Sequence, residues 1–317
     1  MRRLLAVALC AMAKGQNSSC GPVRVSYDHA GFGNAFDVLF VAFDWGRRCN
    51  TSVEIVGDEL DRLRRICERL TCAGASVAAN GPCPPGCPAP LMTWKHTPSS
   101  AYIQTLGRYN IPRFNSSVFV PANGGRWLAP LTCVGPNAAK RAAAGATRPF
   151  TTAAHIRSIR YDFERPPATV AADKENRTHE DSSTENSAAG WARLAGQVQT
   201  RGQRGGDVYI ASDNAPARNA LAHHLASLNL TACYVPRTPG HSSYHTARAD
   251  DDHAMTDWWA LANAEAIIAA DLKCIGKTAD SCTPLGQRRR GRRFSSFSRT
   301  AHRLRLGKKG ILVYVSV

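Results

Sequence analysis

Three groups of polar residues in the second half of the sequence together offer a cation, an acid and hydroxyl groups; two directly follow apolar segments, and the third follows Ile267-Ile268 at a distance. They are His155 with Arg157, Ser212 with Asp213, and the run Ser295-Ser296-Phe297-Ser298. In parallel α/β sheets, ligands bind beyond the carboxyl ends of the strands, so side chains at these positions are expected to meet. An arginine donates two hydrogen bonds to a phosphate, and a helix start attracts an anion. The combination predicts a nucleoside diphosphate site.

Each group alone also has an ordinary structural explanation. The paired serines can cap a helix, His155 can be a hydrogen-bonded core residue, and Asp213 can form a turn. Only the combination of a cation, an acid and hydroxyl groups favours a shared ligand site. The spacing by itself leaves both interpretations open.

Alternating strands and helices in the second half are expected to position these residues. Apolar and β-branched stretches indicate strands, and longer segments with one apolar side indicate helices. The strands are expected at 150–159, 207–211 and 233–235, the helices at 191–198 and 215–228, and a helix joined to a buried strand over 255–270. This alternation predicts an α/β fold with a parallel sheet.

The first half opens with a strand, a glycine-bearing turn, a helix and a second strand, which is the start of a Rossmann-like unit. The strands are expected at 23–27 and 51–56, the helix at 35–45, and the turn at Gly31, Phe32, Gly33 and Asn34. Glycines in such a turn let the backbone approach a ligand closely. An ordinary tight turn is the alternative.

Composition changes indicate two domains. Residues 134–148 resemble a linker or the edge of a first domain, which gives a first domain over 21–147 and a second over 148–317. Residues 164–188 are polar and almost free of large apolar side chains, so we expect a disordered, solvent-exposed insertion there. Asp250-Asp251-Asp252 is expected in a polar loop.

The first thirteen residues have the pattern of a secretory signal peptide. Arg2 and Arg3 precede a short apolar stretch, and Ala11-Met12-Ala13 forms a small-x-small cleavage site. The apolar stretch is too short to span a bilayer, and a short buried helix is the alternative. The expected location is the lumen of the endoplasmic reticulum or Golgi, or the exterior of the cell.

The cysteines and glycosylation sequons agree with secretion. Removal of residues 1–13 takes Cys10 away and leaves ten of the eleven cysteines, an even number suited to disulfides. The closest group, Cys67, Cys72, Cys83 and Cys87, contains no CxxC pair, so disulfides are favoured over zinc. Five Asn-x-Ser/Thr sequons are expected on surface loops: Asn17, Asn50, Asn115, Asn176 and Asn229.

The net charge of +16 is concentrated near the end of the sequence. Residues 288–309 hold ten Lys and Arg and no acidic residue. Such a segment can bind an acidic polysaccharide, or it can be a solvated loop. A nuclear address has the same pattern, but the signal peptide opposes it, so no nucleic-acid partner is expected.

Four motifs, in order along the chain, resemble those of the GDP-fucose-dependent fucosyltransferase superfamily, which includes protein O-fucosyltransferases and α-1,2 and α-1,6 enzymes. The motifs are HAGFGNAFDVLFVAFDWGRRCNTSVEI, AAHIRSIRYD, DVYIASDN, and DWWALANAEAIIA followed by SSFSRTA. The resemblance implies a GT-B-like α/β fold of two Rossmann-like domains with parallel sheets facing a central cleft. It also implies an inverting transfer of fucose from GDP-fucose to a glycan or protein hydroxyl, with no metal or other cofactor.

The resemblance further implies roles for individual residues. Arg157 is the β-phosphate clamp that stabilises the departing GDP, and Asn34 lies near the reacting centre. The other donor-binding residues are His155, Asp213, Asp257, Ser295, Ser296 and Phe297. Of these, Asp213 and Asp257 contact the guanine–ribose side or shape that pocket. The acidic residue after His155-Ile156-Arg157 is displaced to Asp162, and the insertion between Ala270 and Ser295 is long. A catalytically inactive member of the family therefore stays an alternative.

Overall fold

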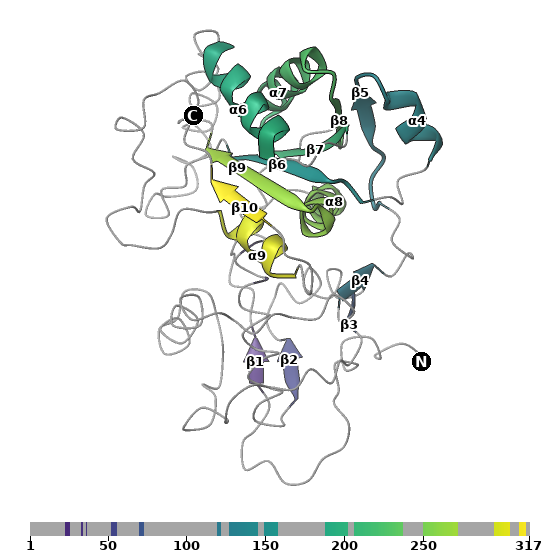
Figure 1. Cartoon of the computed structure of the whole chain (residues 1–317). Helices are drawn as coiled ribbons and strands as arrows, with labels where there is room; N and C mark the ends of the chain where they lie inside the picture. The colour runs from purple at the N-terminus through teal and green to yellow at the C-terminus, as the bar shows by residue number, and fades with distance from the viewer. Residues whose placement is uncertain are drawn as a thin grey trace, which may run out of the picture. The chain divides into compact units, whose positions relative to one another are not determined.

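The computed structural model describes about two fifths of the chain, which divides into two compact units (Figure 1). The described residues are 23–25, 33, 36, 52–55, 70–72, 119–121, 127–144, 149–157, 188–201, 206–236, 250–271, 295–304 and 311–314. The first unit comprises Met1–Arg126, Ser242–His245 and Arg299–Lys308, and the second comprises Trp127–His241, Thr246–Ser298 and Lys309–Val317. No helix in the described part is long and apolar enough to cross a membrane.

The described residues of the first unit form two short strand pairs. Strand β1 (Val23–Val25) pairs in parallel with β2 (Val53–Ile55), and β3 (Leu70–Cys72) pairs antiparallel with β4 (Phe119–Pro121). The strands expected near 23–27 and 51–56 are therefore confirmed. Gly33 is helical and buried, so helix begins before Ala35, and Gly33 is not a turn residue.

The second unit contains a six-stranded sheet in the order β10-β9-β6-β7-β8-β5. Every neighbouring pair is parallel except β5 with β8. The strands are β5 (Thr132–Val134), β6 (Thr152–Arg157), β7 (Asp207–Ser212), β8 (Thr231–Tyr234), β9 (Ala266–Asp271) and β10 (Ile311–Tyr314). Central parallel strands are covered on both faces, which explains their continuous apolar sequences. The α/β class expected from the sequence is confirmed.

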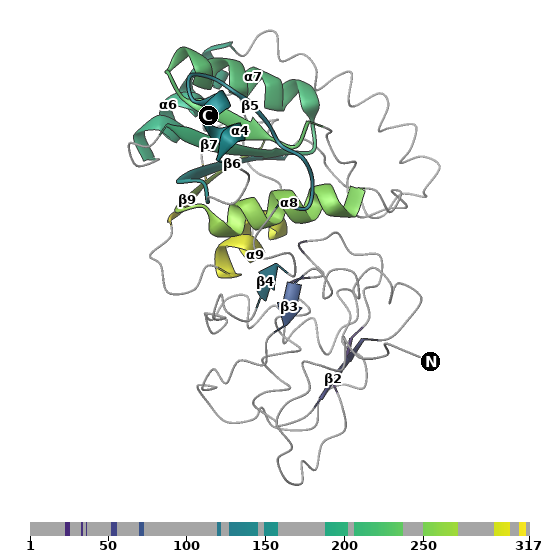
Figure 2. The same ribbon diagram turned by 90° about the vertical axis from the view of Figure 1, so that its right-hand side faces the viewer.

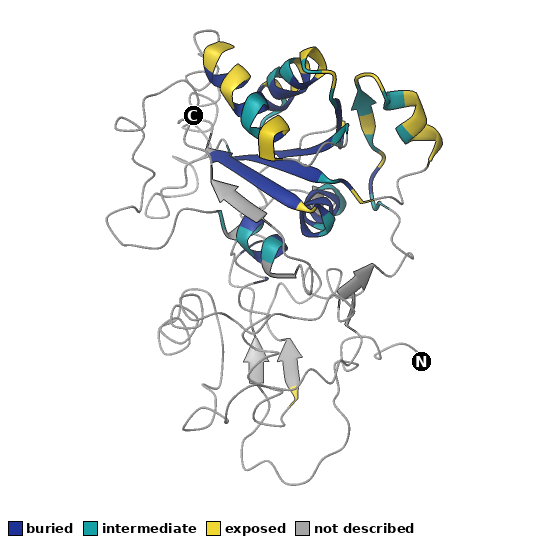
Figure 3. Cartoon of the chain, in the orientation of Figure 1, coloured by how far each residue is buried: buried dark blue, intermediate teal, exposed yellow. Residues whose placement is uncertain are grey.

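Helices cover both faces of this sheet (Figures 1 and 2). They are α4 (Ala138–Ala143), α6 (Ala188–Arg201), α7 (Ala215–Ser227), α8 (Asp250–Asn263) and α9 (Ser296–Leu304). Helices α6 and α7 lie side by side on one face, and α8 lies on the other. The leucines of α6 and α7, together with Val198 of α6, pack against Ile156, Ile210 and Ile268 of the strands. This core is buried, whereas the outer surfaces of the helices are exposed (Figure 3).

Helix α7 follows β7 after a well-formed cap. Asn214 Oδ1 accepts a hydrogen bond from the backbone N–H of Ala217 at 2.8 Å, and Pro216 occupies the first turn. The helix ends before Asn229, which is exposed and has φ 61°, a left-handed conformation that asparagine tolerates. The sequon at Asn229 is thus in a surface turn, and the other four sequons lie outside the described residues.

Two segments expected to be irregular are helical. Asp250-Asp251-Asp252 forms the first turn of α8 instead of a polar loop, because acidic side chains are favourable at a helix amino terminus. Residues 138–143, expected in a linker, form α4, whose alanines have high helix propensity. Because α4 contacts β5 and β8, this segment belongs with the sheet of the second unit.

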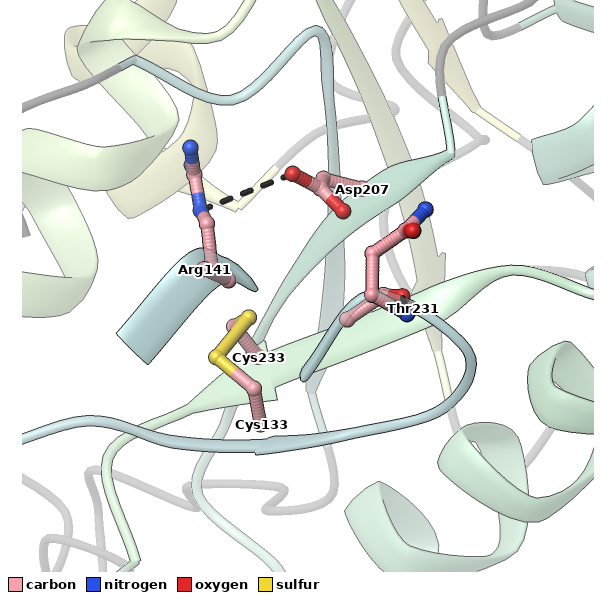
Figure 4. Close-up of polar contacts among 6 residues, drawn as sticks. Cys133, Arg141, Asp207, Thr231 and Cys233 are labelled. Carbon is pink, nitrogen blue, oxygen red and sulfur yellow. Dashed lines mark hydrogen bonds and ion pairs between the residues drawn. A yellow bond between two sulfur atoms is a disulfide. The ribbon is translucent and has the colours of Figure 1, made fainter. Parts of the chain in front are cut away.

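A disulfide and polar contacts attach β5 and α4 to the sheet (Figure 4). Cys133 and Cys233 lie directly opposite each other in β5 and β8, with Cα atoms 4.1 Å apart and their sulfurs bonded. Arg141 of α4 lies 3.7 Å from an Asp207 carboxylate oxygen and stacks over the Phe150 ring at 3.8 Å. The cysteines at 67, 83 and 87, and the side chain of Cys72, lie outside the described part.

Candidate functional site

The sheet of the second unit reverses its strand order between β6 and β9. The five parallel strands lie in the order β8, β7, β6, β9 and β10 across the sheet. From β6, the chain adds β7 and β8 on one side and then β9 and β10 on the other. In sheets with such a reversal, ligands bind beyond the carboxyl ends of the strands at the point where the order reverses. Arg157 and Asp271, which end these strands, are register partners. This edge is the expected ligand position.

His155 connects the end of β6 to the start of α9. Its Nδ1 lies 2.5 Å from Ser298 Oγ, and its ring lies 5.4 Å from the Phe297 ring, between centroids. His155 and Ser298 are both buried. Two of the three polar groups singled out in the sequence, which are 143 residues apart, are therefore brought together at the reversal point. Ser295 is half-buried, and its Oγ accepts a hydrogen bond from the backbone N–H of Phe297 at 3.3 Å. The side chain of Ser296 lies outside the described residues.

The charge at this edge comes from Arg157 and not from His155. Burial, followed by the charge of Arg157, lowers the pKa of His155 from 6.5 to about 3. The imidazole is therefore neutral at physiological pH and acts through hydrogen bonding. Arg157 is half-buried, one strand repeat further along the same face of β6. An anion at the end of β6 would be neutralised by the Arg157 guanidinium.

The third group, Ser212 with Asp213, ends β7 beside β6. Ser212 Oγ accepts a hydrogen bond from the backbone N–H of Asn214 at 3.1 Å, and Asn214 caps α7. Ser212 is therefore engaged in shaping the strand–helix turn. Asp213 is half-buried and contributes negative charge near Asp257.

Asp257 lies in α8 and forms a buried hydrogen bond with the sheet. Tyr209 of β7 donates its hydroxyl to Asp257 Oδ1 at 2.6 Å, and both residues are buried. Burial raises the pKa of Asp257 from 3.8 to about 7, although the Tyr209 hydrogen bond and the charge of Arg218 oppose the rise. The carboxyl group of Asp257 therefore changes charge near neutral pH.

Arg218 and Tyr209 belong to this constellation but were not identified in the sequence. Arg218 Nη1 donates to the Val235 carbonyl at 2.8 Å, and its guanidinium lies 4.4 Å from the centre of the Tyr234 ring. The sequence did contain a signal for Arg218, because this arginine lies beside the buried Ala217 within the apolar stripe of a helix. Tyr209 gave no signal, because a tyrosine within an apolar strand is an ordinary core residue.

The expected acceptor-side residues are mostly outside the described part of the chain. Gly31, Phe32 and Asn34 fall there, so their expected roles stay predictions. Gly33 is described only as a buried helical residue. In the described ranges, no three His, Cys, Asp or Glu side chains are grouped as metal ligands.

The opposite pKa shifts of Asp257 and His155 predict opposite effects on stability. Asp257 releases its proton near pH 3.8 in the unfolded chain but near pH 7 in the folded chain, so its contribution to stability falls as pH rises between these values. We expect Asp257→Asn to raise the free energy of unfolding at pH 8 by about 2–4 kcal/mol, with little effect at pH 4. Urea unfolding of both proteins from pH 4 to 8 measures the difference.

His155 supplies the matched comparison for that experiment. Its pKa is about 3 in the folded chain and 6.5 in the unfolded chain, so its contribution to stability falls as pH drops from 6.5. The free energy of unfolding of His155→Asn, relative to that of the wild type, should therefore increase at low pH. The corresponding difference for Asp257→Asn should increase at high pH. A difference from wild type that is constant across the pH range would contradict the assigned shift.

Comparison with known proteins adds no assignment to this geometry: no protein-family model matches the chain, and no curated protein matches its sequence.

Proposed function

We propose that the chain is a glycosyltransferase that moves fucose from GDP-fucose to a glycan or protein hydroxyl in the secretory pathway. The main support is the reversal of strand order between β6 and β9, where His155, Arg157 and the start of α9 converge. Two of the four motifs that resemble fucosyltransferases, AAHIRSIRYD and the SSFSRTA part of the last one, contribute residues to this constellation. A diphosphate suits it, since an arginine and a helix amino terminus both favour phosphate oxygens.

The proposed reaction is an inverting displacement at the anomeric carbon of fucose. The acceptor oxygen forms a bond to that carbon as the bond to the β-phosphate oxygen breaks, and the acceptor proton passes to a base. Negative charge grows on the departing GDP, and Arg157 with the amino terminus of α9 is proposed to stabilise it. The proposal therefore has the donor bind to the second unit. A GT-B-like architecture, with acceptor binding by Asn34 and its neighbours in the first domain, completes the proposal.

Calorimetry and a transfer assay on the purified chain lacking residues 1–13 test the proposal. We expect micromolar affinity for GDP, weaker binding of UDP, and turnover of GDP-fucose in the presence of a glycoprotein acceptor. GDP binding without turnover would favour an inactive family member. Salt-sensitive binding of heparin without GDP binding would instead favour a polysaccharide-binding protein acting through residues 288–309, and would overturn the proposal.

A further inference from the structure

Tyr209 occupies the middle of β7, with its ring held by two other aromatic residues. The side chain is fully buried. Its ring is stacked with that of Trp127, with centroids 6.0 Å apart and planes at 18°, and it is tilted against the Phe150 ring at 5.1 Å. Aromatic pairs at these separations have preferred geometries. The Tyr209 hydroxyl is therefore presented at one fixed place on the face of the sheet that α8 covers.

Helix α8 is fixed next to this hydroxyl by a second contact. Thr256 Oγ1 accepts a hydrogen bond from the backbone N–H of Ala129 at 3.0 Å and donates to the Asp252 carbonyl at 2.7 Å. The next residue, Asp257, accepts from Tyr209. Trp127 and Ala129, in the segment before β5, thus contact β7 and α8 respectively. This packing restrains both partners of the Tyr209–Asp257 hydrogen bond.

The surroundings of Asp257 place its carboxyl group toward the end of the sheet where the ligand is proposed to bind. Its charged neighbours are Arg218, in the first turn of α7, and Asp213, which directly follows β7. Both lie after the carboxyl end of that strand. Stability alone does not require a carboxyl group here, because an apolar pair of similar volume is often at least as stable as a buried polar one.

We propose that Tyr209 is a positioning residue that acts through Asp257: its hydroxyl holds the Asp257 carboxyl group in the orientation that binds the nucleoside part of the ligand. This inference rests on the proposed function, extended by the position of Asp257 on the guanine–ribose side of GDP-fucose that the sequence resemblance implies. The Tyr209 side chain is 0% exposed and so cannot contact the ligand itself, whereas Asp257 keeps 5% exposure. Its substitution should therefore affect binding only while Asp257 is present.

A double-mutant cycle on GDP affinity tests this dependence. Calorimetry would compare the wild type with Tyr209→Phe, Asp257→Leu and the double variant, with the unfolding midpoint of each measured in parallel. We expect Tyr209→Phe to weaken GDP binding about tenfold, which is the effect of losing one hydrogen bond to a charged group. We expect the double variant to bind GDP as Asp257→Leu does, because residues that act as a unit are not additive.

Val198→Ala is the matched control, since it removes buried methyl groups from α6 in the core on the opposite face of the sheet. It should lower stability and leave GDP affinity unchanged. Wild-type affinity in Tyr209→Phe would overturn the inference, and this result suffices if Asp257→Leu does not fold. A tenfold loss that persists in the Asp257→Leu background would also overturn it. Failure of the wild type to bind GDP would overturn the proposed function, and the inference with it.

Discussion

Under the proposed function, replacing Arg157 with alanine is expected to lower the turnover of GDP-fucose by about 10²–10³-fold, which is the usual effect of removing one group that stabilises transition-state charge. Arg157 ends β6 at the reversal of strand order, beside a histidine whose low pKa keeps it neutral. Burial is the larger cause of that low pKa and remains in the variant, so His155 does not replace the missing positive charge. Steady-state kinetics with saturating acceptor would measure the loss in kcat.

Two further variants make the Arg157 result specific. Arg157→Lys keeps the charge but loses the planar pair of donors, so its turnover should fall between those of wild type and Arg157→Ala. Arg193→Ala removes the same charge from the exposed surface of α6 and should leave kcat unchanged. Equal kcat values for wild type and Arg157→Ala would exclude the assigned role. Equal losses in Arg157→Ala and Arg193→Ala would indicate a general effect of net charge.

The parallel sheet was predictable because its strands carry their own signal. Residues 208–211 and 267–270 are hydrophobic and buried throughout, as expected for strands covered on both faces. The polar residues that end them were identified because strand ends are where such folds bind ligands. The contact of His155 with Ser298 follows from strand order, which local sequence does not encode.

The contacts that the sequence did not reveal depend on tertiary packing. Tyr209 and Asp257 are 48 residues apart, on a strand and a helix, and no periodic pattern links them. Residues 134–148 were expected to be a linker because glycine, proline and alanine are common there. Their alanines instead form α4 once β5 has paired with β8, since a helix of only six residues depends on tertiary contacts. The Cys133–Cys233 bond likewise follows from strand register.

Loss of the Cys133–Cys233 disulfide is expected to lower the free energy of unfolding by about 4–5 kcal/mol. The bond joins residues separated by 100 positions, and closing a loop of that length removes much conformational entropy from the unfolded chain. It also secures β5, an antiparallel edge strand of three residues that pairs only with β8 in the described sheet. Urea unfolding of the Cys133→Ser/Cys233→Ser double variant would measure the effect.

Val134→Ala, in the same strand, serves as the control for lost packing without a lost crosslink, and it should destabilise the protein by much less than the double cysteine variant. Thiol alkylation followed by peptide mass analysis should find both cysteines protected in the oxidised wild type. Modification of both would contradict the bond itself. If the bond is present but the double variant is as stable as wild type, then the β5–β8 ladder and the contacts of Arg141 hold α4 and β5 in place without it. The long loop would in that case already be restrained in the unfolded chain, because a crosslink stabilises a fold only by removing freedom that the unfolded state would otherwise have.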